Sequence, residues 1–240
     1  MGPLDIAIGA SYRVFAPDWP GYGESDRPQI LHTVPFYISV LSGFLEGLAL
    51  PKPNLAGISM GGAVAFGFAL EYPQSARRLV LVDSYGIQDR VPGHRLSYVF
   101  LRTPLVNKLF WAAAARSRWL VRAALQRIIH DRSRITEDLV ESVCVELGRP
   151  GSTAAFQSFQ LSELRWRGVK TVYMNRLHEI RIPTLLVHGT KDSLVPLRYA
   201  EEAHARISGS RLTVIPGAGH WAQRERPEVF LEAVSSFVRG

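Results

Sequence analysis

One serine of the chain lies in a pattern of small residues that could expose a nucleophile. Residues 57–61 read Gly-Ile-Ser-Met-Gly and match G-x-S-x-G, between a predicted strand and a predicted helix. Gly57 and Gly61 would let the backbone turn tightly, so that the hydroxyl of Ser59 projects above a sheet. The N–H of Met60, at the start of the helix, is placed to stabilise an oxyanion. A glycine-rich turn with a capping serine is the alternative without chemistry.

A serine hydroxyl needs a base, and the base needs a carboxylate that orients it. Asp192 follows one predicted strand, and His220 follows the last one. Open α/β sheets build their sites on loops at the carboxyl ends of strands, which is where both residues are expected. Asp83, after a strand of its own, is the rival acid. His188 is interpreted as a structural histidine that closes a strand.

The residues between these groups predict the elements that position them. Strands are expected at 12–18, 54–58, 78–82, 183–188 and 211–215, and helices at 34–50, 60–72, 197–207 and 227–238. Continuous apolar runs such as 78–82 are typical of strands that are covered on both faces. The alternation of strand and helix predicts an α/β fold with a mostly parallel central sheet.

The middle of the chain breaks this alternation. Residues 86–182 are almost wholly helical in pattern, with 16 Lys and Arg against 8 Asp and Glu, whereas the remainder holds 12 against 13. We expect a helical insertion at 86–182, carried on a body made of residues 1–85 and 183–240. Helix 104–132 is expected to be amphipathic, with Leu109, Leu120, Val121, Ala124 and Ile128 on one side and Lys108, Arg116, Arg118, Arg122 and Arg127 on the other.

Composition excludes several classes of protein. The 240 residues are 47% apolar and 20% charged, which is ordinary for a globular chain and excludes overall disorder. One cysteine, Cys144, excludes a disulfide scaffold and a multi-cysteine zinc site, and we expect it to be an inert core thiol. The first residues show no secretory signal, so a cytoplasmic location is expected. The net charge of +7 comes without a nucleic-acid-binding motif, and no nucleic-acid partner is expected.

Four segments together resemble the α/β-hydrolase fold, in its capped esterase, lipase and carbon–carbon hydrolase type. They are residues 12–26, 57–62, 188–192 and 219–227. The resemblance implies that Ser59 is the nucleophile, that His220 acts as general base and then as acid, and that Asp192 orients it. It implies no cofactor and no metal, and the helical insertion corresponds to the cap domain. A serine nucleophile argues against the dehalogenases and epoxide hydrolases of this fold, which use aspartate.

The resemblance also shows a departure from the family. Members place several strands before the one that corresponds to 12–18, and a His-Gly turn after one of them supplies a second oxyanion donor. The only His-Gly here is at 188–189, and residues 4–10 resemble the end of a helix that joins two of those strands. An N-terminally truncated fold is therefore expected.

The sequence thus predicts a serine hydrolase that cleaves carboxylic esters of apolar or aromatic acyl groups through an acyl-enzyme. The alternatives are a carbon–carbon bond hydrolase of the meta-cleavage-product type, indicated by the stretch at 219–223, and a non-catalytic remnant without a complete oxyanion hole. The basic cap is expected to rest weakly on anionic lipid, to attract anionic substrates, or merely to present a solvated face.

Overall fold

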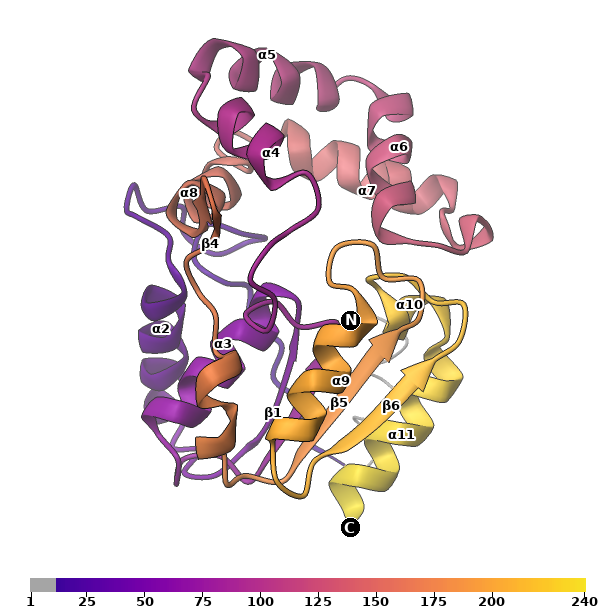
Figure 1. Cartoon of the computed structure of the whole chain (residues 1–240). Helices are drawn as coiled ribbons and strands as arrows, with labels where there is room; N and C mark the ends of the chain where they lie inside the picture. Colours follow the sequence, from indigo (N-terminus) through magenta and orange to yellow (C-terminus); the bar gives the residue numbers. More distant parts are fainter. Residues whose placement is uncertain (1–11) are drawn as a thin grey trace.

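The structure, a computed structural model, describes residues 12–240. Its centre is a four-stranded sheet in the order β1-β2-β5-β6, in which every neighbouring pair is parallel (Figure 1). The strands are β1 (Asn54–Ile58), β2 (Arg78–Val82), β5 (Thr184–Gly189) and β6 (Arg211–Ile215). The predicted α/β fold with a parallel sheet is confirmed, and each of these strands lies within one residue of its expected place.

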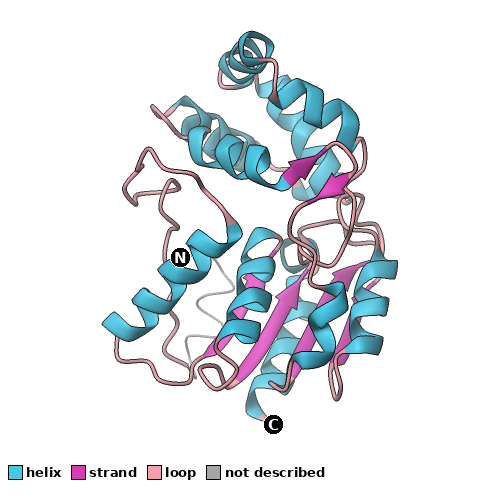
Figure 2. Cartoon of the chain, turned by 60° about the vertical axis from the view of Figure 1, so that its left-hand side comes forward, coloured by secondary structure: helices cyan, strands magenta, loops and turns pink. Residues whose placement is uncertain are grey.

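Helices cover both faces of this sheet (Figure 2). Along β2, Leu79 and Leu81 face one apolar cluster, whereas Val80 and Val82 face another, as the twofold alternation of side chains in a strand requires. The first face is covered by α2 (Val34–Gly47), α3 (Met60–Glu71), η2 (Met174–Glu179) and α9 (Leu197–Arg206). The second face is covered by α11 (Pro227–Arg239), which follows the short α10 (Ala222–Glu225).

Helix α3 is apolar around its whole circumference, because it lies between the sheet and α2. Its residues from Gly62 to Ala69 are all buried. A Cβ on Gly62 would overlap Ser84, and a Cβ on Gly67 would overlap Ile38 of α2 and Tyr173. The glycines therefore bring α3 close to its neighbours, which holds the residue that precedes the helix, Ser59, against the sheet.

The strand expected at 12–18 is wrong. These residues form no hydrogen-bonded strand, and among residues 12–240 nothing pairs with the outer edge of β1. A strand is stabilised by its ladder, so an extended β-rich run without a neighbouring strand stays irregular. The expected helix end at 4–10 lies outside the described residues.

The segment between β2 and β5 forms a separate layer over the carboxyl ends of the strands (Figure 1). It contains α4 (His94–Leu101), α5 (Pro104–Ala114), α6 (Arg118–Ile128), η1 (Arg132–Arg134), α7 (Glu137–Gly148), α8 (Ala154–Glu163) and the antiparallel pair β3 (Leu164–Arg165) and β4 (Gly168–Val169). We call this layer, residues 91–172, the helical cap. Its own apolar cluster joins α6 to α7. The last residues of the expected insertion, Met174, Leu177 and Ile180, instead pack in the core of the body.

The single amphipathic helix expected at 104–132 is wrong. The chain breaks at 115–117, where Ser117 caps α6 by accepting a hydrogen bond from the N–H of Leu120. Because of this break, the apolar residues expected on one side of a single helix do not face the same way. Val121 is buried, whereas Leu109 is 61% exposed. Thr103 precedes α5, and its hydroxyl donates to the carbonyl of Val99 rather than capping the helix.

Cys144 is half-buried beside the apolar cluster of the cap, rather than fully inside a core. Among the described helices, none has the length and apolar character that crossing a membrane requires.

Candidate functional site

Ser59 lies at the turn between β1 and α3, in a backbone conformation that residues other than glycine rarely adopt. Its φ is 49° and its ψ is −116°, which for a residue with a Cβ costs of the order of 1–3 kcal/mol. A Cβ on Gly57 would overlap the carbonyl oxygen of Gly61, so the turn requires glycine at 57. A Cβ on Gly61 would meet nothing within 4 Å among the described residues, so the steric role expected for Gly61 is wrong.

Met60 is the first residue of α3. The first N–H groups of a helix have no carbonyl partner within it and carry its positive dipole end. A negatively charged oxygen close to Ser59 would therefore lie at the positive end of α3. The role of Met60 as an oxyanion donor stays a prediction.

His220 and Asp192 form a buried pair. Nδ1 of His220 lies 2.8 Å from Oδ2 of Asp192, and the two side chains are 5% and 0% exposed. Oδ1 of the same carboxylate accepts from the N–H groups of Leu194 and Val195 at 2.7 and 2.9 Å. Because a carboxylate accepts, the proton of His220 is on Nδ1, which leaves the lone pair of Nε2 free to act as a base.

The loops that carry Ser59, Asp192 and His220 meet at one edge of the sheet. The N–H of Ser59 donates to Val82 O at 3.0 Å. The carboxylate of the next residue, Asp83, accepts from the N–H of Gly189 at 2.9 Å and from that of Ala222 at 3.1 Å. Asp83 thus joins the ends of β2 and β5 to the turn that follows His220. The hydrogen bonds of residues 12–240 do not include one between Ser59 Oγ and His220, a bond that is often loose without substrate.

Asp83, the rival acid, accepts hydrogen bonds from backbone N–H groups and is not bonded to His220. Burial raises the pKa of Asp83 well above its ordinary value, and its two backbone hydrogen bonds oppose that shift only in part. Its positive φ of 42° suits an aspartate at a strained strand end. The structure therefore pairs His220 with Asp192 and leaves Asp83 as a link between loops.

His188 is buried between the two carboxylates. Its Nε2 lies 2.7 Å from Val195 O, so Nε2 carries the proton, and Nδ1 lies 3.8 Å from Oδ1 of Asp83. Burial lowers the pKa of His188 below its ordinary value of 6.5, although the bond to Val195 and the charge of Asp192 oppose this shift. Asp83, His188 and Asp192 have ligand atoms within 4.8 Å of one another. Oδ1 of Asp83 and Oδ1 of Asp192 already accept from backbone N–H groups, and Oδ2 of Asp192 is bonded to His220. We therefore interpret the cluster as structural rather than as a metal site.

A second buried carboxylate ties the histidine loop to the helical cap. Glu225, fully buried, accepts from the N–H of Gly219 at 2.7 Å and from the N–H of Asp131 at 2.6 Å. The N–H of His220 itself donates to Ile128 O at the end of α6, at 2.7 Å. Arg226 completes the contact with an ion pair to Asp131 at 2.8 Å. The loop that holds the histidine is therefore bonded to the cap at His220 itself and, a few residues later, through Glu225 and Arg226.

This fold and site agree with the comparisons. The family model described as alpha/beta hydrolase fold matches residues 4–227. The chain belongs to that family.

The chain is also similar to individual hydrolases and esterases of this fold. The chain is 31% identical over 228 residues to a 2-hydroxy-6-oxo-2,4-heptadienoate hydrolase of Pseudomonas putida, with 94% of this chain and 78% of the relative covered. A solved meta-cleavage product hydrolase from Pseudomonas fluorescens IP01 is similar with a TM-score of 0.83 and 26% identity, over 98% of this chain and 83% of that one. A thermophilic esterase from Thermogutta terrifontis is similar with a TM-score of 0.76 and 25% identity, over the same shares.

Ser59, Asp192 and His220 lie on the loops that the sequence predicted, whereas the contacts of Glu225 and Arg226 around them were not predicted. Glu225 and Arg226 lie in the segment 219–227 that carried the resemblance, and their types alone indicated no role. The signal available was a carboxylate five residues after a candidate histidine. Asp131, the partner of Glu225 in the cap, is 94 residues away in the sequence, so no local pattern links the two residues.

Proposed function

We propose that the chain is a serine hydrolase in which Ser59 is the nucleophile, His220 the base and Asp192 its positioning partner. The observation that carries this proposal is the His220–Asp192 bond of 2.8 Å, which leaves Nε2 unprotonated, at the sheet edge that also presents Ser59. The strained φ of Ser59 supports it, because such strain is typical of a side chain that a fold holds in place for chemistry.

The proposed reaction follows from these positions. Oγ of Ser59 attacks the substrate carbonyl carbon while Nε2 of His220 takes the hydroxyl proton. Asp192 stabilises the resulting imidazolium, and the N–H of Met60 donates to the oxyanion. His220 then returns the proton to the leaving group as its bond to the carbonyl carbon breaks, which leaves an acyl group on Ser59. Water then attacks the acyl carbon while His220 takes one of its protons. The bond from that carbon to Oγ of Ser59 breaks, His220 returns the proton to Oγ, and the acid is released.

The bond that the enzyme cleaves is either a carbon–carbon bond or a carboxylic ester bond. Several relatives are named hydrolases of 2-hydroxy-6-oxo-dienoates, which favours a carbon–carbon bond in a vinylogous diketone. The esterase among the similar structures favours a carboxylic ester of an apolar or aromatic acyl group. We propose the diketone as the primary substrate class and the ester as the second. The single Cys144 is compatible with the reducing cytoplasm, which we propose as the location.

Two experiments test this function. A fluorophosphonate probe should label the wild-type chain and leave Ser59→Ala unlabelled, whereas an unlabelled wild type that is folded would favour the non-catalytic remnant. Turnover of a 2-hydroxy-6-oxo-dienoate is then compared with that of a short-chain p-nitrophenyl ester. A kcat/KM that is higher for the dienoate supports the carbon–carbon hydrolase, and the reverse order assigns the chain to the esterases.

A further inference from the structure

Helix α5 of the helical cap turns its apolar side outward. Leu105, Val106 and Leu109 are 69%, 51% and 61% exposed, whereas the polar Asn107 is 5% exposed. This is the reverse of the usual pattern, in which the apolar stripe of a surface helix faces the core. The helix crosses the end of the cap that is farthest from the sheet (Figure 1). The neighbouring α4 adds Leu96 and Val99, which are 78% and 51% exposed.

The same part of the chain is strongly basic. From Arg90 to His130 it contains eight Lys and Arg residues and no Asp or Glu. Arg118 and Arg122 are paired with Glu137 of α7, so their charge is partly compensated. Lys108 of α5 and Arg116, which follows the end of α5, have no ion pair among the described residues.

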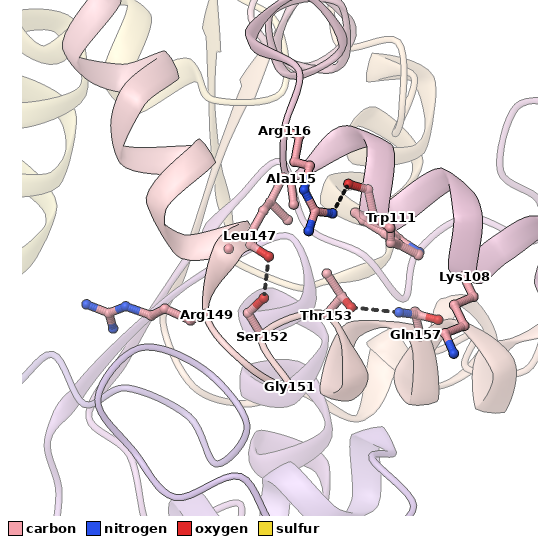
Figure 3. A pocket seen from close by; sticks show the side chains of 12 residues that line it. Lys108, Trp111, Ala115, Arg116, Leu147, Arg149, Gly151, Ser152, Thr153 and Gln157 are labelled. Carbon is pink, nitrogen blue, oxygen red and sulfur yellow. Dashed lines mark hydrogen bonds between the residues drawn. The ribbon is translucent and has the colours of Figure 1, made fainter.

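A pocket of about 470 Å³ lies directly beside α5 (Figure 3). The residues on one side of it are Lys108 and Trp111 of α5 and the following Arg116, and those on the other side are Ser152 and Thr153. No residue of its lining is acidic. Arg116 donates only to Ala112 O of the preceding helix α5. The indole Nε1 of Trp111 is buried and has no hydrogen-bond partner. Arg149 also borders the pocket but points away from it toward its partners Glu24 and Glu146.

We propose that this surface, the outer side of α5 with the adjoining pocket, docks the protein on an anionic phospholipid membrane. The pocket supplies the cations of Lys108 and Arg116 to a lipid phosphate. The apolar side of α5 enters the boundary between headgroups and acyl chains. An amphipathic helix with basic residues beside its apolar face binds such an interface by these two contributions together. The docking surface lies on the cap, away from the sheet edge that carries Ser59.

Charge makes a second copy of the chain a poor occupant of the same surface. A symmetric contact across α5 would bring Lys108 and Arg116 of one copy against the same residues of the other. Because residues 90–130 contain no carboxylate, nothing within this segment would compensate the repulsion. An anionic surface has the opposite sign and removes this cost.

The test is co-sedimentation of the whole chain with vesicles at low salt. We expect binding to vesicles of equal parts phosphatidylcholine and phosphatidylglycerol, no binding to phosphatidylcholine alone, and release at about 1 M salt, where the Debye length is about 3 Å. Leu105→Asn combined with Leu109→Asn should weaken binding by at least about tenfold. Lys108→Gln combined with Arg116→Gln should weaken it by about fivefold for each charge removed.

Matched variants on the body serve as controls. Leu31→Asn combined with Val229→Asn changes two exposed apolar residues, and Lys52→Gln combined with Arg77→Gln removes two exposed charges; all four should leave vesicle binding unchanged. Thermal unfolding checks that every variant is folded. The proposal is overturned if the wild type ignores anionic vesicles, if the body variants weaken binding as much as the α5 variants, or if light scattering finds a dimer that Leu105→Asn with Leu109→Asn dissociates.

Discussion

The N–H of His220 donates to the carbonyl of Ile128, at 2.7 Å, so the candidate base is bonded directly to the last turn of a cap helix. Histidine and helix are 92 residues apart in the sequence. The position of the imidazole therefore depends on the placement of the cap as well as on the sheet. A change that loosens the cap should move His220, even where it leaves Ser59 and Asp192 in place.

Glu225→Gln should weaken this connection. An amide has one acceptor oxygen, so one of the two N–H groups that Glu225 binds, those of Gly219 and Asp131, loses its partner. We expect the free energy of unfolding to fall by about 1–3 kcal/mol and kcat to fall more than KM changes, because His220 is displaced while the binding surface remains. The matched control is Arg224→Gln, an exposed neighbour, which should change neither quantity. Equal kcat in both variants would show that Glu225 does not position His220.

Replacing the two aspartates should separate their roles. Asp192→Asn should lower kcat by about 10⁴-fold, because the amide no longer holds the proton of His220 on Nδ1. Asp83→Asn should chiefly lower stability, since it disturbs the bonds to Gly189 and Ala222 while the His220–Asp192 pair remains. Steady-state kinetics and urea unfolding measure the two effects. A larger loss of kcat in Asp83→Asn would assign the catalytic acid to Asp83.

The two glycines of the serine turn should respond in opposite ways. Gly57→Ala places a Cβ against Gly61 O, so the turn must shift, and we expect lost fluorophosphonate labelling together with a lower melting temperature. Gly61→Ala points into open space and should leave stability unchanged or raise it by about 0.5–1 kcal/mol, because alanine suits a helix better than glycine does. A tolerated Gly57→Ala would contradict the described turn.

His188 should make stability fall in mild acid. Because the pKa of His188 is lowered below 6.5 by burial, the neutral form is favoured in the folded state. Its contribution to the free energy of unfolding is fully present above about pH 6.5 and is lost as the pH falls through the pKa of His188 in the folded state. His188→Gln keeps a donor for Val195 O and cannot be protonated. Urea unfolding at about pH 7.5 and about pH 5 should therefore show a smaller loss in the variant than in the wild type.

The comparison with this variant is needed because Asp83 acts with the opposite sign. Its pKa is raised, so its contribution is present at low pH and is lost as the pH rises. Both proteins contain Asp83, and the difference between them reports on His188. An identical pH dependence in the two proteins would contradict a buried, neutral His188.

The four central strands and the loops that carry Ser59, Asp192 and His220 could be predicted from the sequence. Apolar runs such as 78–82 and the glycine at 57 encode local requirements, namely burial on both faces and a turn without a Cβ. Such requirements concern a residue and its near neighbours, so a single sequence contains them. The local pattern was insufficient at 12–18, because a β-rich run becomes a strand only where another strand offers a ladder.

The partners of the candidate residues follow from contacts between segments that are far apart in the chain. Asp192 and Asp83 both follow strands, and the choice between them depends on the loops that reach each carboxylate. The sequence likewise did not predict that the apolar side of α5 is exposed. Helical spacing shows that a helix has an apolar side but not whether another element covers it. Hydrogen bonds and packing between distant segments settle both questions, and these depend on distances in space that sequence separation does not express.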